Sequence, residues 1–222
     1  MPSTAYLASV KSYQFMSINA PQHHPANPLP QHIAPVPLDK AYRLLNHGPT
    51  VLVSAAHAGQ HNVMAAAWAC ALDFAPPKVT VVLDKATRTR ELVEASGMFA
   101  LQLPTVPQAA MTVGIGTDSS KTVPDKLQRH GVEVFEMPGN HPAQTTPPLV
   151  QGCAAWLVCR VIPEPHNQQA YDLFIGEVVA AWADDRVFRN GHWEFDTAPD
   201  ALRTLHYVAG GQFYATGASV KV

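Results

Sequence analysis

The chain has 222 residues, of which 47% are hydrophobic, and its formal net charge is −2. This length suits one large domain or one domain with appendages, and the apolar fraction is sufficient for a core without disulfides or metal. The near-neutral charge and the scattered basic residues give no electrostatic basis for binding nucleic acid or an anionic membrane.

The cysteines Cys70, Cys153 and Cys159 form no CxxC pair, so we expect reduced thiols rather than a disulfide framework or a zinc site. No apolar run approaches the roughly 20 residues of a membrane-spanning helix. The N-terminus also lacks the basic and apolar regions of a signal peptide. We therefore expect a cytoplasmic protein with no metal.

Residues 1–37 are rich in proline, which breaks regular structure. We expect an extended N-terminal arm, either loose or draped on a partner surface, in which residues 5–18 could still form a strand or helix. His23, His24 and His32 are expected to lie in a solvated loop, with metal binding as the less favoured alternative. The predicted folded domain spans residues 38–222.

The folded domain is predicted to begin with a helix over Lys40–Leu45 that is capped by Asp39 and stopped at Gly48-Pro49. A second helix is expected over Arg88–Ser96, with Thr87 as its cap and Gly97 just beyond its end. Further helices are expected over Thr105–Gly116 and Val123–His130. The expected strands are Thr50–Ala55, Val63–Leu72 (helix is the alternative), Val79–Leu83, Met98–Leu103, Val132–Phe135, Ala154–Val161 and Leu173–Trp182.

The C-terminal part is predicted to contain two hairpins, one turning at Asn190-Gly191 and one at Gly210-Gly211. A loop over Pro138–Pro148 and a bulge or close approach at Gly176 are also expected. Short strands outnumber helices, which favours a closed or sandwiched β body with covering helices. The alternative is a doubly wound sheet, supported only by the strand-helix-strand unit from Val79 to Leu103.

A run of small residues, Ala65-Ala66-Ala67, stands between Met64 and Trp68. Small side chains would let backbone N–H and C=O groups reach the edge of a planar ring. Met64 could pack on that ring, and Asn62 could either bond the ring edge or end the turn. For Trp68 a place in the core is favoured over a wall of the site.

A second cluster follows the strand Val79–Leu83, where Asp84 and Lys85 lead into a predicted helix start. Helix N-termini offer free N–H groups and a positive dipole end to an anion. Thr87, Thr89, Lys85 and Arg88 would add hydroxyl and charge-assisted hydrogen bonds, and cations at a helix start are themselves unfavourable unless they hold an anion. One ligand that combines a planar ring with a phosphate is FMN.

With these motifs in view, the chain resembles the flavin reductase-like FMN-binding proteins over about residues 37–217, and most closely their flavoredoxin branch. The resemblance rests on the order and spacing of several short segments. They are Asn62-Val63-Met64 with Ala67-Trp68, Pro76-Pro77, Asp84-Lys85 with Thr87 and Thr89, Gly97-Met98-Phe99-Ala100-Leu101, Asp125-Lys126-Leu127, Cys159-Arg160-Val161, Leu173–Val178, and Gly210-Gly211 with Tyr214.

The resemblance implies a mainly β split barrel with covering helices, usually a homodimer, with FMN at or near the subunit interface. The cofactor-binding residues that we expect are Asn62, Met64, Ala65, Ala66, Ala67, Trp68, Asp84, Lys85, Thr87, Arg88, Thr89, Gln102 and Tyr214. For Tyr214 the core is favoured over a cover on the flavin. For Lys126 a solvated helix face is favoured over the cofactor of a neighbouring subunit.

The family often has Gly-Asp-His where this chain has Ala170-Tyr171-Asp172, and often Asn in place of Gln102. Both departures concern the electron-donor end of the site. The leading hypothesis is an oxidoreductase that passes electrons from NADH or NADPH through FMN to a flavin, a protein or a small acceptor. The alternatives are a flavoredoxin-type carrier with tightly bound FMN and no nicotinamide site, and a non-catalytic scaffold that binds a partner. No side chain is predicted as an acid or base.

Overall fold

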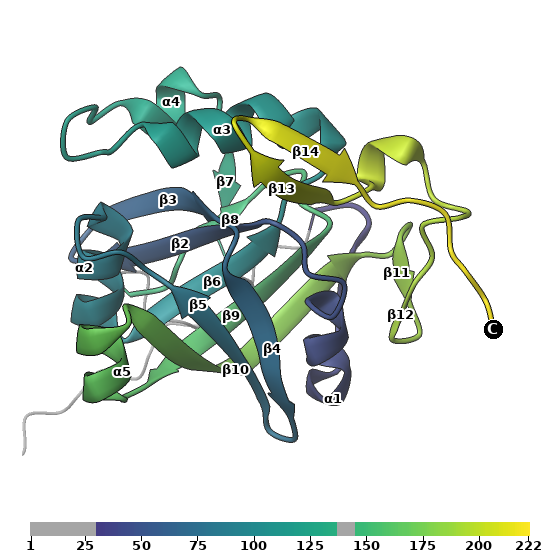
Figure 1. The fold of residues 1–222 in the computed structure, drawn as a ribbon, viewed down its shortest axis with the longest axis horizontal. Coiled ribbons are helices and arrows are strands. Elements are labelled where there is room, and N and C mark those ends of the chain that lie inside the picture. Colours follow the sequence, from purple (N-terminus) through teal and green to yellow (C-terminus); the bar gives the residue numbers. More distant parts are fainter. Residues whose placement is uncertain (1–29, 137–144) are drawn as a thin grey trace, which may run out of the picture.

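Eight strands form one sheet in the order β3-β2-β6-β9-β10-β5-β4, with β1 paired to β10 (Figure 1). The structure is a computed structural model that describes residues 30–136 and 145–222; most of the predicted arm and part of the predicted loop Pro138–Pro148 lie outside these residues. The strands of this sheet are β1 (Ile33–Pro35), β2 (Val51–His57), β3 (Gln60–Ala66), β4 (Ala69–Phe74), β5 (Pro77–Val82), β6 (Met98–Leu103), β9 (Ala155–Ile162) and β10 (Leu173–Asp184).

Every neighbouring pair in this sheet is antiparallel. The prediction of a mainly β body with covering helices is therefore confirmed, and the doubly wound alternative is wrong because it requires parallel strands. β1 lies within the predicted arm, where Ala34 pairs with Ala183 of β10.

The two outer strands in the order, β3 and β4, follow each other in the chain. The predicted single strand Val63–Leu72 is wrong, because the chain leaves β3 at Ala66 and resumes as β4 at Ala69. At this corner the backbone N–H of Val82 donates to the carbonyl of Trp68 over 3.0 Å. The sheet thus curls into a barrel that stays split along the free edge of β3, which is the split-barrel fold that the resemblance implies.

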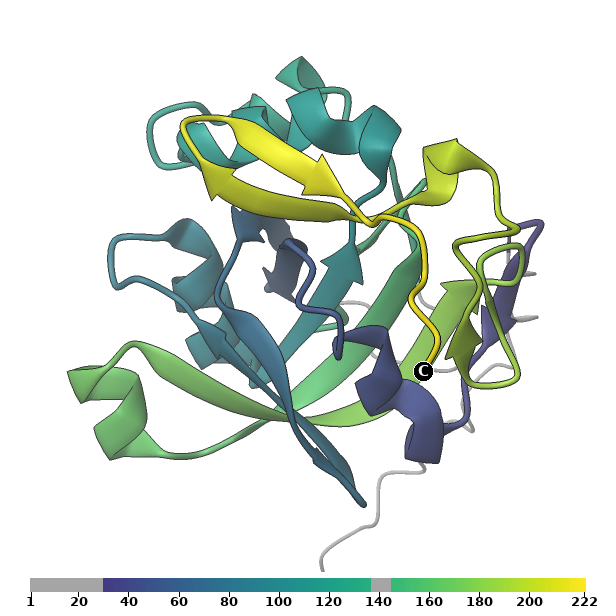
Figure 2. The same cartoon turned by 45° about the vertical axis from the view of Figure 1, so that its right-hand side comes forward.

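Helices surround the barrel rather than alternating with its strands (Figures 1 and 2). The α-helices are α1 (Leu38–Ala41), α2 (Arg88–Ser96), α3 (Ala109–Thr117), α4 (Lys126–Arg129) and α5 (Pro165–Ala170), and the short 3-10 turns are η1 (Tyr42–Leu44), η2 (Val106–Gln108) and η3 (Asp200–Leu202).

Local signals set the ends of α2 as predicted. Thr87 Oγ1 accepts a hydrogen bond from the Arg90 backbone N–H at 3.4 Å, and Gly97 ends the helix with a φ of 70°. The predicted cap Asp39 is wrong, since Pro37 precedes α1 and Asp39 lies inside its first turn. Sequence analysis did not predict α5.

Three two-stranded ribbons complete the fold. They pair β7 (Val134–Phe135) with β8 (Leu149–Val150), β11 (Phe188–Arg189) with β12 (His192–Trp193), and β13 (Leu205–Ala209) with β14 (Gln212–Ala215). Both predicted C-terminal hairpins are confirmed, and Asn190 and Gly191 have the positive φ values, 52° and 76°, of a two-residue hairpin turn. Figures 1 and 2 place the hairpin β13–β14 beside α3 above the barrel.

Two hydrophobic clusters hold these layers together. One fills the barrel and includes Val53, Leu101 and Leu157, while the other lies between the barrel wall and α3 and includes Ile115 and Trp156. Because neighbouring residues of a strand point to opposite faces, β2, β6 and β9 contribute to both clusters. Within residues 30–136 and 145–222, no helix has the length and hydrophobicity to cross a bilayer.

The predicted close approach at Gly176 is confirmed. A Cβ atom at this position would lie 2.5 Å from Cζ of Phe99 and 3.0 Å from Cβ of Cys159. The barrel interior has no room for this methyl group.

We expect Gly176→Ala to lower the free energy of unfolding by about 1–3 kcal/mol, because overpacking forces neighbouring side chains off their rotamers. Urea denaturation measures this loss. Gly217→Ala is the matched control, since nothing lies within 4 Å of its Cβ position. Equal stability of the two variants would contradict the packing described here.

Candidate functional site

The two segments singled out from the sequence lie side by side at the split of the barrel. At one end Asn62 Nδ2 donates to Thr89 Oγ1 over 2.9 Å, and at the other Val82 N donates to the carbonyl of Trp68 over 3.0 Å. Since the segments are joined at both ends, residues 63–67 and 83–88 run beside each other at the free edge of β3, here called the opening of the barrel.

A tight turn at Asp84 presents the start of α2 to this opening. Asp84 Oδ1 accepts from the Ala86 backbone N–H at 2.7 Å, and the Asp84 carbonyl accepts from the Thr87 backbone N–H and hydroxyl at 3.0 and 2.8 Å. The backbone N–H groups of Arg88 and Thr89, in the first turn of the helix, have no acceptor within the helix. They are the natural donors of the site.

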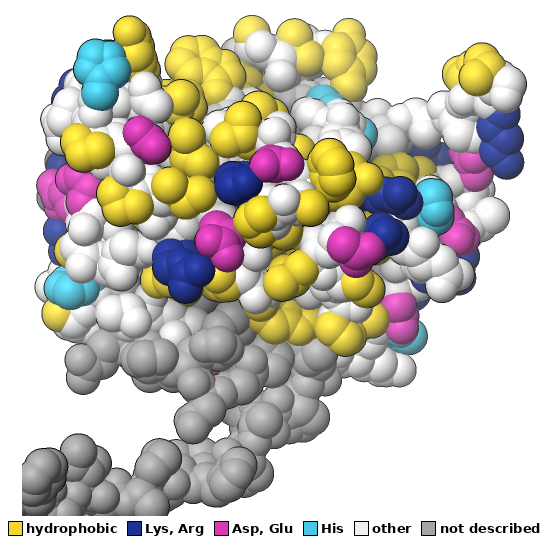
Figure 3. All heavy atoms as spheres, turned by 90° about the horizontal axis from the view of Figure 1, so that it is seen from below, with side chains coloured by type: hydrophobic (Ala, Val, Ile, Leu, Met, Phe, Trp, Pro, Cys, Tyr) yellow, Lys and Arg dark blue, Asp and Glu magenta, His cyan; other side chains and the backbone are white. Residues whose placement is uncertain are grey.

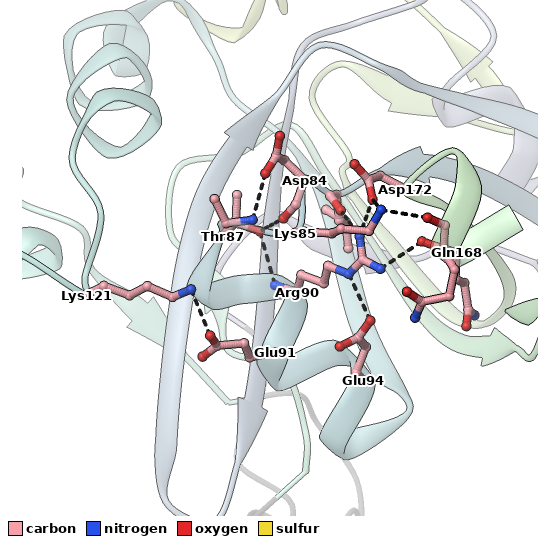
Figure 4. A network of polar contacts seen from close by, with 12 residues as sticks. Asp84, Lys85, Thr87, Arg90, Glu91, Glu94, Lys121, Gln168 and Asp172 are labelled. Carbon is pink, nitrogen blue, oxygen red and sulfur yellow. Dashed lines mark hydrogen bonds and ion pairs between the residues drawn. The ribbon is translucent and has the colours of Figure 1, made fainter.

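The cations around the start of α2 are all paired with carboxylates. Figure 4 shows the surroundings of Lys85, Arg90 and Lys121. The predicted excess of positive charge is therefore absent, and the argument that these cations require an anion is wrong. The pairs are Lys85–Asp172 (3.4 Å), Arg88–Glu91 (2.5 Å), Arg90–Asp172 (2.5 Å), Arg90–Glu94 (2.8 Å) and Lys121–Glu91 (2.8 Å).

Arg90 has a structural role and is not accessible to a ligand, since its side chain is only 3% exposed. It donates to the carbonyls of Leu83 and Gln168 at 3.0 and 2.7 Å, and so fastens α5 to the start of α2. Burial opposes its charge, but hydrogen bonds to Glu94 and Asp172 outweigh burial and raise the pKa of Arg90. The hydrogen bond from Arg90 in turn lowers the pKa of Asp172.

A cleft of about 510 Å³ lies between the start of α2, the β2–β3 turn and the loop from α3 to α4. Its lining includes Gly59, Asn62, Arg88, Ser120, Leu127 and Gln128. Among the described residues, no hydrogen-bond partner reaches Asn62 Oδ1 or Ser120 Oγ, although both atoms are buried. Ser120 carried no sequence signal, because a lone serine in a polar loop is common.

A second cleft, of about 280 Å³, lies at the other end of β3, between α3 and the C-terminal hairpin. The alanine run forms its floor, and α3 and the hairpin form its walls. Its lining includes Ala65, Ala66, Ala67, Thr112, Tyr207 and Phe213. The two clefts lie at opposite ends of the strand whose small side chains the sequence analysis assigned to a planar ligand.

Two aromatic residues differ from the favoured predictions. Trp68 is 74% exposed and Tyr214 is 63% exposed, so the prediction that each belongs to the core is wrong. Trp68 stands at the corner between β3 and β4, beside the opening. Tyr214 lies on the hairpin but does not line the cleft. Neighbouring side chains of a strand point to opposite faces, and it is Phe213 that faces the cleft. Met64 is half-buried and packs against the barrel interior.

The structure does not bring Gln102 to the opening. It is fully buried, donates to Ser54 Oγ at 2.8 Å and accepts from the Val150 N–H at 2.5 Å, so it links β2, β6 and β8. The predicted solvated Lys126 is also wrong. It is buried, which lowers its pKa, and its ammonium donates to the carbonyls of Ile115 and Asp118 at 3.1 Å each, closing the end of α3.

Among the described residues, neither the cysteine thiols nor any cluster of titratable side chains forms a further reactive or metal-binding site. The three cysteines are free, and burial raises the pKa of the Cys153 and Cys159 thiols, so neither ionises at neutral pH. Within the part of the chain that the structure describes, no group of three or more His, Cys, Asp and Glu side chains is placed to hold a metal ion.

A histidine anchors the hairpin that covers the second cleft. His47 lies beside Trp193, Phe195 and His206, with ring centroids 5.1, 5.6 and 5.5 Å away, and its Nε2 is 2.8 Å from Thr204 Oγ1. Burial, and secondly the charge of His206, lower the pKa of His47 to about 4. The hairpin is therefore held by a neutral imidazole.

Comparison with known proteins gives a consistent result. Residues 43–213 match the family model described as flavin reductase like domain. The protein YddH of Escherichia coli strain K12 is 41% identical over 188 residues, which cover 84% of this chain and 96% of that protein.

Solved structures show the same fold. An FMN-binding domain of a flavin reductases-like enzyme from Shewanella baltica OS155 is 62% identical, with a TM-score of 0.82 over 86% of this chain and 97% of that chain. The flavoredoxin of Desulfovibrio vulgaris (Miyazaki F) is 24% identical, with a TM-score of 0.63 over 79% of this chain and 90% of that chain, and shows a shared fold alone.

The buried His47 predicts an acid-sensitive stability. Its pKa is 6.5 when unfolded and about 4 when folded, so the unfolded chain binds more protons between these values. We expect this contribution to be complete above pH 6.5 and to fall by about 3 kcal/mol as the pH approaches 4.

Urea denaturation at pH 7 and pH 4.5 measures this loss. His47→Gln, which keeps a hydrogen-bond donor toward Thr204, should show a smaller loss than the natural chain. The exposed His166 provides the control variant, His166→Gln. A pH profile of His47→Gln that matched the natural chain would rule out this anchor.

Proposed function

Because this chain belongs to the flavin reductase-like domain family, we propose that it is an oxidoreductase that holds FMN at the split of its barrel. The observation that carries the proposal is that the alanine run and the start of α2 lie side by side, joined through the hydrogen bonds Asn62–Thr89 and Trp68–Val82. The Shewanella baltica domain, described as FMN-binding and 62% identical, supports the choice of cofactor.

The start of α2 would hold the phosphate of FMN. Its donors would be the backbone N–H groups of Arg88 and Thr89, with Lys85 and Arg88 supplying charge. Both cations are paired with carboxylates in partly exposed positions, where an ion pair contributes about 0–1 kcal/mol, so exchange of a carboxylate for a phosphate costs little. The backbone N–H groups at the start of α2 are held in place by the turn at Asp84 and Thr87, so they need no rearrangement to bind a phosphate.

The edge of β3 would hold the ring of FMN. Ala65, Ala66 and Ala67 leave its backbone accessible, Met64 packs beneath, and Trp68 stands exposed at the corner. A role for Tyr214 of the hairpin in covering the flavin stays a prediction. When bound, FMN supplies the electron transfer, and the chain supplies position and electrostatics.

The electron donor would be NADH or NADPH, and the acceptor a flavin, a protein or a small molecule. One feature favours the alternative of a flavoredoxin-type carrier without a nicotinamide site. Asp172, in the segment that departs from the family pattern, is held by Arg90 and Lys85 and is not free to contact a donor.

Rapid anaerobic mixing separates these two functions. FMN-loaded protein that loses its yellow absorbance on mixing with NADH or NADPH is a reductase. If neither donor bleaches the flavin while dithionite does, the carrier replaces the reductase. Protein that takes up no FMN would reject both.

A homodimer would cover an apolar strip along β4. Trp68, Leu72 and Phe74 are all exposed, because alternate side chains of β4 point outward. Figure 3 shows the lower face of the molecule, where hydrophobic side chains are spread between a few charged ones. Light scattering that gave the mass of a single 24.0 kDa chain at micromolar concentration would reject this dimer.

Arg88 provides a test of the phosphate site. We expect Arg88→Ala to weaken FMN binding about tenfold and to leave riboflavin binding unchanged, because only FMN has a phosphate for a charge-assisted hydrogen bond. Fluorescence titration measures both affinities. The control is Arg160→Ala, which removes an exposed cation of β9 that is paired with Glu177 of β10. Equal weakening for FMN and riboflavin would place the phosphate elsewhere.

A further inference from the structure

Four side chains form one hydrogen-bonded network at the base of the C-terminal hairpin. His47 Nε2 lies 2.8 Å from Thr204 Oγ1, and Thr204 Oγ1 lies 2.6 Å from Thr216 Oγ1. Thr216 Oγ1 in turn lies 3.2 Å from His206 Nε2, and His206 Nδ1 lies 3.1 Å from the Gly48 carbonyl oxygen. The network joins the segment before β2 to both ends of the hairpin, because Thr204 precedes β13 and Thr216 follows β14.

Counting donors fixes the direction of each hydrogen bond in this network. A carbonyl only accepts, so His206 Nδ1 carries the proton and the Nε2 atom of neutral His206 is an acceptor. Thr216 has one hydroxyl proton and donates it to His206, so Thr204 donates to Thr216. The Thr204 proton is then used, so His47 Nε2 donates to Thr204. Neutral His47 is therefore the Nε2–H tautomer, and neutral His206 is the Nδ1–H tautomer.

This direction leaves a bare nitrogen atom at the inner end of the network. His47 Nδ1 is buried, and no hydrogen-bond partner among the described residues reaches it. The rings of Trp193 and Phe195 lie beside His47, with centroids 5.1 and 5.6 Å from its own. A proton on Nδ1 would find only weak acceptors in such surroundings, so the network is best satisfied in the direction described.

We propose that this network is an acid-operated latch that holds the C-terminal hairpin, with the proton on His206 as its trigger. A proton added at His206 Nε2 turns this atom from an acceptor into a donor. The Thr216 hydroxyl then turns to Thr204 Oγ1, and the Thr204 hydroxyl turns to His47 Nε2. His47 releases its Nε2 proton to water and takes one up at Nδ1, so the net uptake is the single proton on His206.

Reversal weakens the attachment of the hairpin. The reversed network ends on the Nδ1–H group of His47, which has no good acceptor, whereas the original network ends on a carbonyl. The hairpin forms a wall of the cleft whose floor is the alanine run. Acid therefore loosens this wall through a histidine that is half-buried at the surface, and the latch does not require a ligand in the cleft.

The competing path for the Thr216 proton is the weaker one. The Thr204 carbonyl oxygen lies 3.4 Å from Thr216 Oγ1, whereas Thr204 Oγ1 lies 2.6 Å away. Hydrogen bonds between a hydroxyl and an oxygen are mostly about 2.7–2.8 Å long, so the hydroxyl of Thr204 is the better acceptor. Only this path carries the change from His206 to His47.

Few charged or titratable groups face the network from neighbouring segments. They are Arg203, Asp200 and Tyr214 near His206, and the pair Arg189–Glu194 near Trp193. Arg203 donates to the Thr216 carbonyl at 2.6 Å and is paired with Asp200 at 2.8 Å. Among the described residues, only His32 and His130 are histidines paired with a carboxylate, so no carboxylate neutralises a charge on the latch.

The signals of the imidazole nitrogens test the latch directly. In protein labelled with ¹⁵N at histidine, we expect His47 as the Nε2–H tautomer and His206 as the Nδ1–H tautomer at pH 7.5. As the pH falls, the His47 proton should move to Nδ1 with the same midpoint as the protonation of His206. The same tautomer for both rings at pH 7.5, or an unchanged His47 while His206 titrates, would overturn the proposal.

The middle of the network provides a matched pair of variants. Thr216→Val removes the hydroxyl and keeps the shape of the side chain, whereas Thr216→Ser keeps the hydroxyl. The reporters are the backbone amides of Thr50 and Tyr207, which donate to the Leu205 carbonyl and to Thr50 Oγ1 at 2.8 Å each and so attach the hairpin to β2.

We expect the hydrogen-exchange protection of these two amides to fall about fivefold as His206 becomes protonated, while the amides of β9 keep theirs. Thr216→Ser should keep this fall. Thr216→Val should show low protection of both amides at either pH, with no further fall. A natural chain without the fall, or a Thr216→Val variant with the same fall as the natural chain, would show that the network is not a latch.

Discussion

The free edge of β3 is the constraint on which the site depends. The barrel cannot close there, because the chain turns a corner at Ala67-Trp68 and continues as the opposite edge strand, β4. An unpaired strand edge presents N–H and C=O groups, and the first turn of α2 presents further N–H groups. The Asn62–Thr89 hydrogen bond sets these two rows of groups along one opening. A ligand with a polar-edged ring and an anionic tail satisfies both rows at once.

Charge has a different role from the one that the sequence indicates. Lys85, Arg88 and Arg90 follow one another closely in the chain and read as a cationic cluster. Asp172, from a distant part of the chain, pairs with Lys85 and Arg90, whereas Glu91 of α2 itself pairs with Arg88. Selection of an anion would therefore rest on fixed N–H groups more than on net charge. Arg90 instead joins α5 to the turn at Leu83, so the pairing stiffens the turn that aims the helix.

The sequence predicted those features that depend on local chemistry. Thr87 and Gly97 define α2 because a cap and a left-handed residue act within one turn of the helix. The exposure of Trp68 and the burial of Lys126 were predicted wrongly, because both depend on elements far away in the chain: the open split and the end of α3. The assignment of one segment to the ring and the other to the phosphate stays a prediction, and only the fold shows that hydrogen bonds join the two segments.

The two clefts at opposite ends of β3 are bordered by elements that are held through different physical interactions. The C-terminal hairpin is anchored by the neutral His47, which responds to acid, whereas the loop from α3 to α4 is anchored by the pair Lys121–Glu91. Both partners of that pair are partly exposed, so salt screens their attraction. We therefore expect acid to weaken the attachment of the C-terminal hairpin first, and salt to weaken the attachment of the loop from α3 to α4 first. Because neither cover belongs to the segment that forms the floor, each can change without altering the edge of β3 itself.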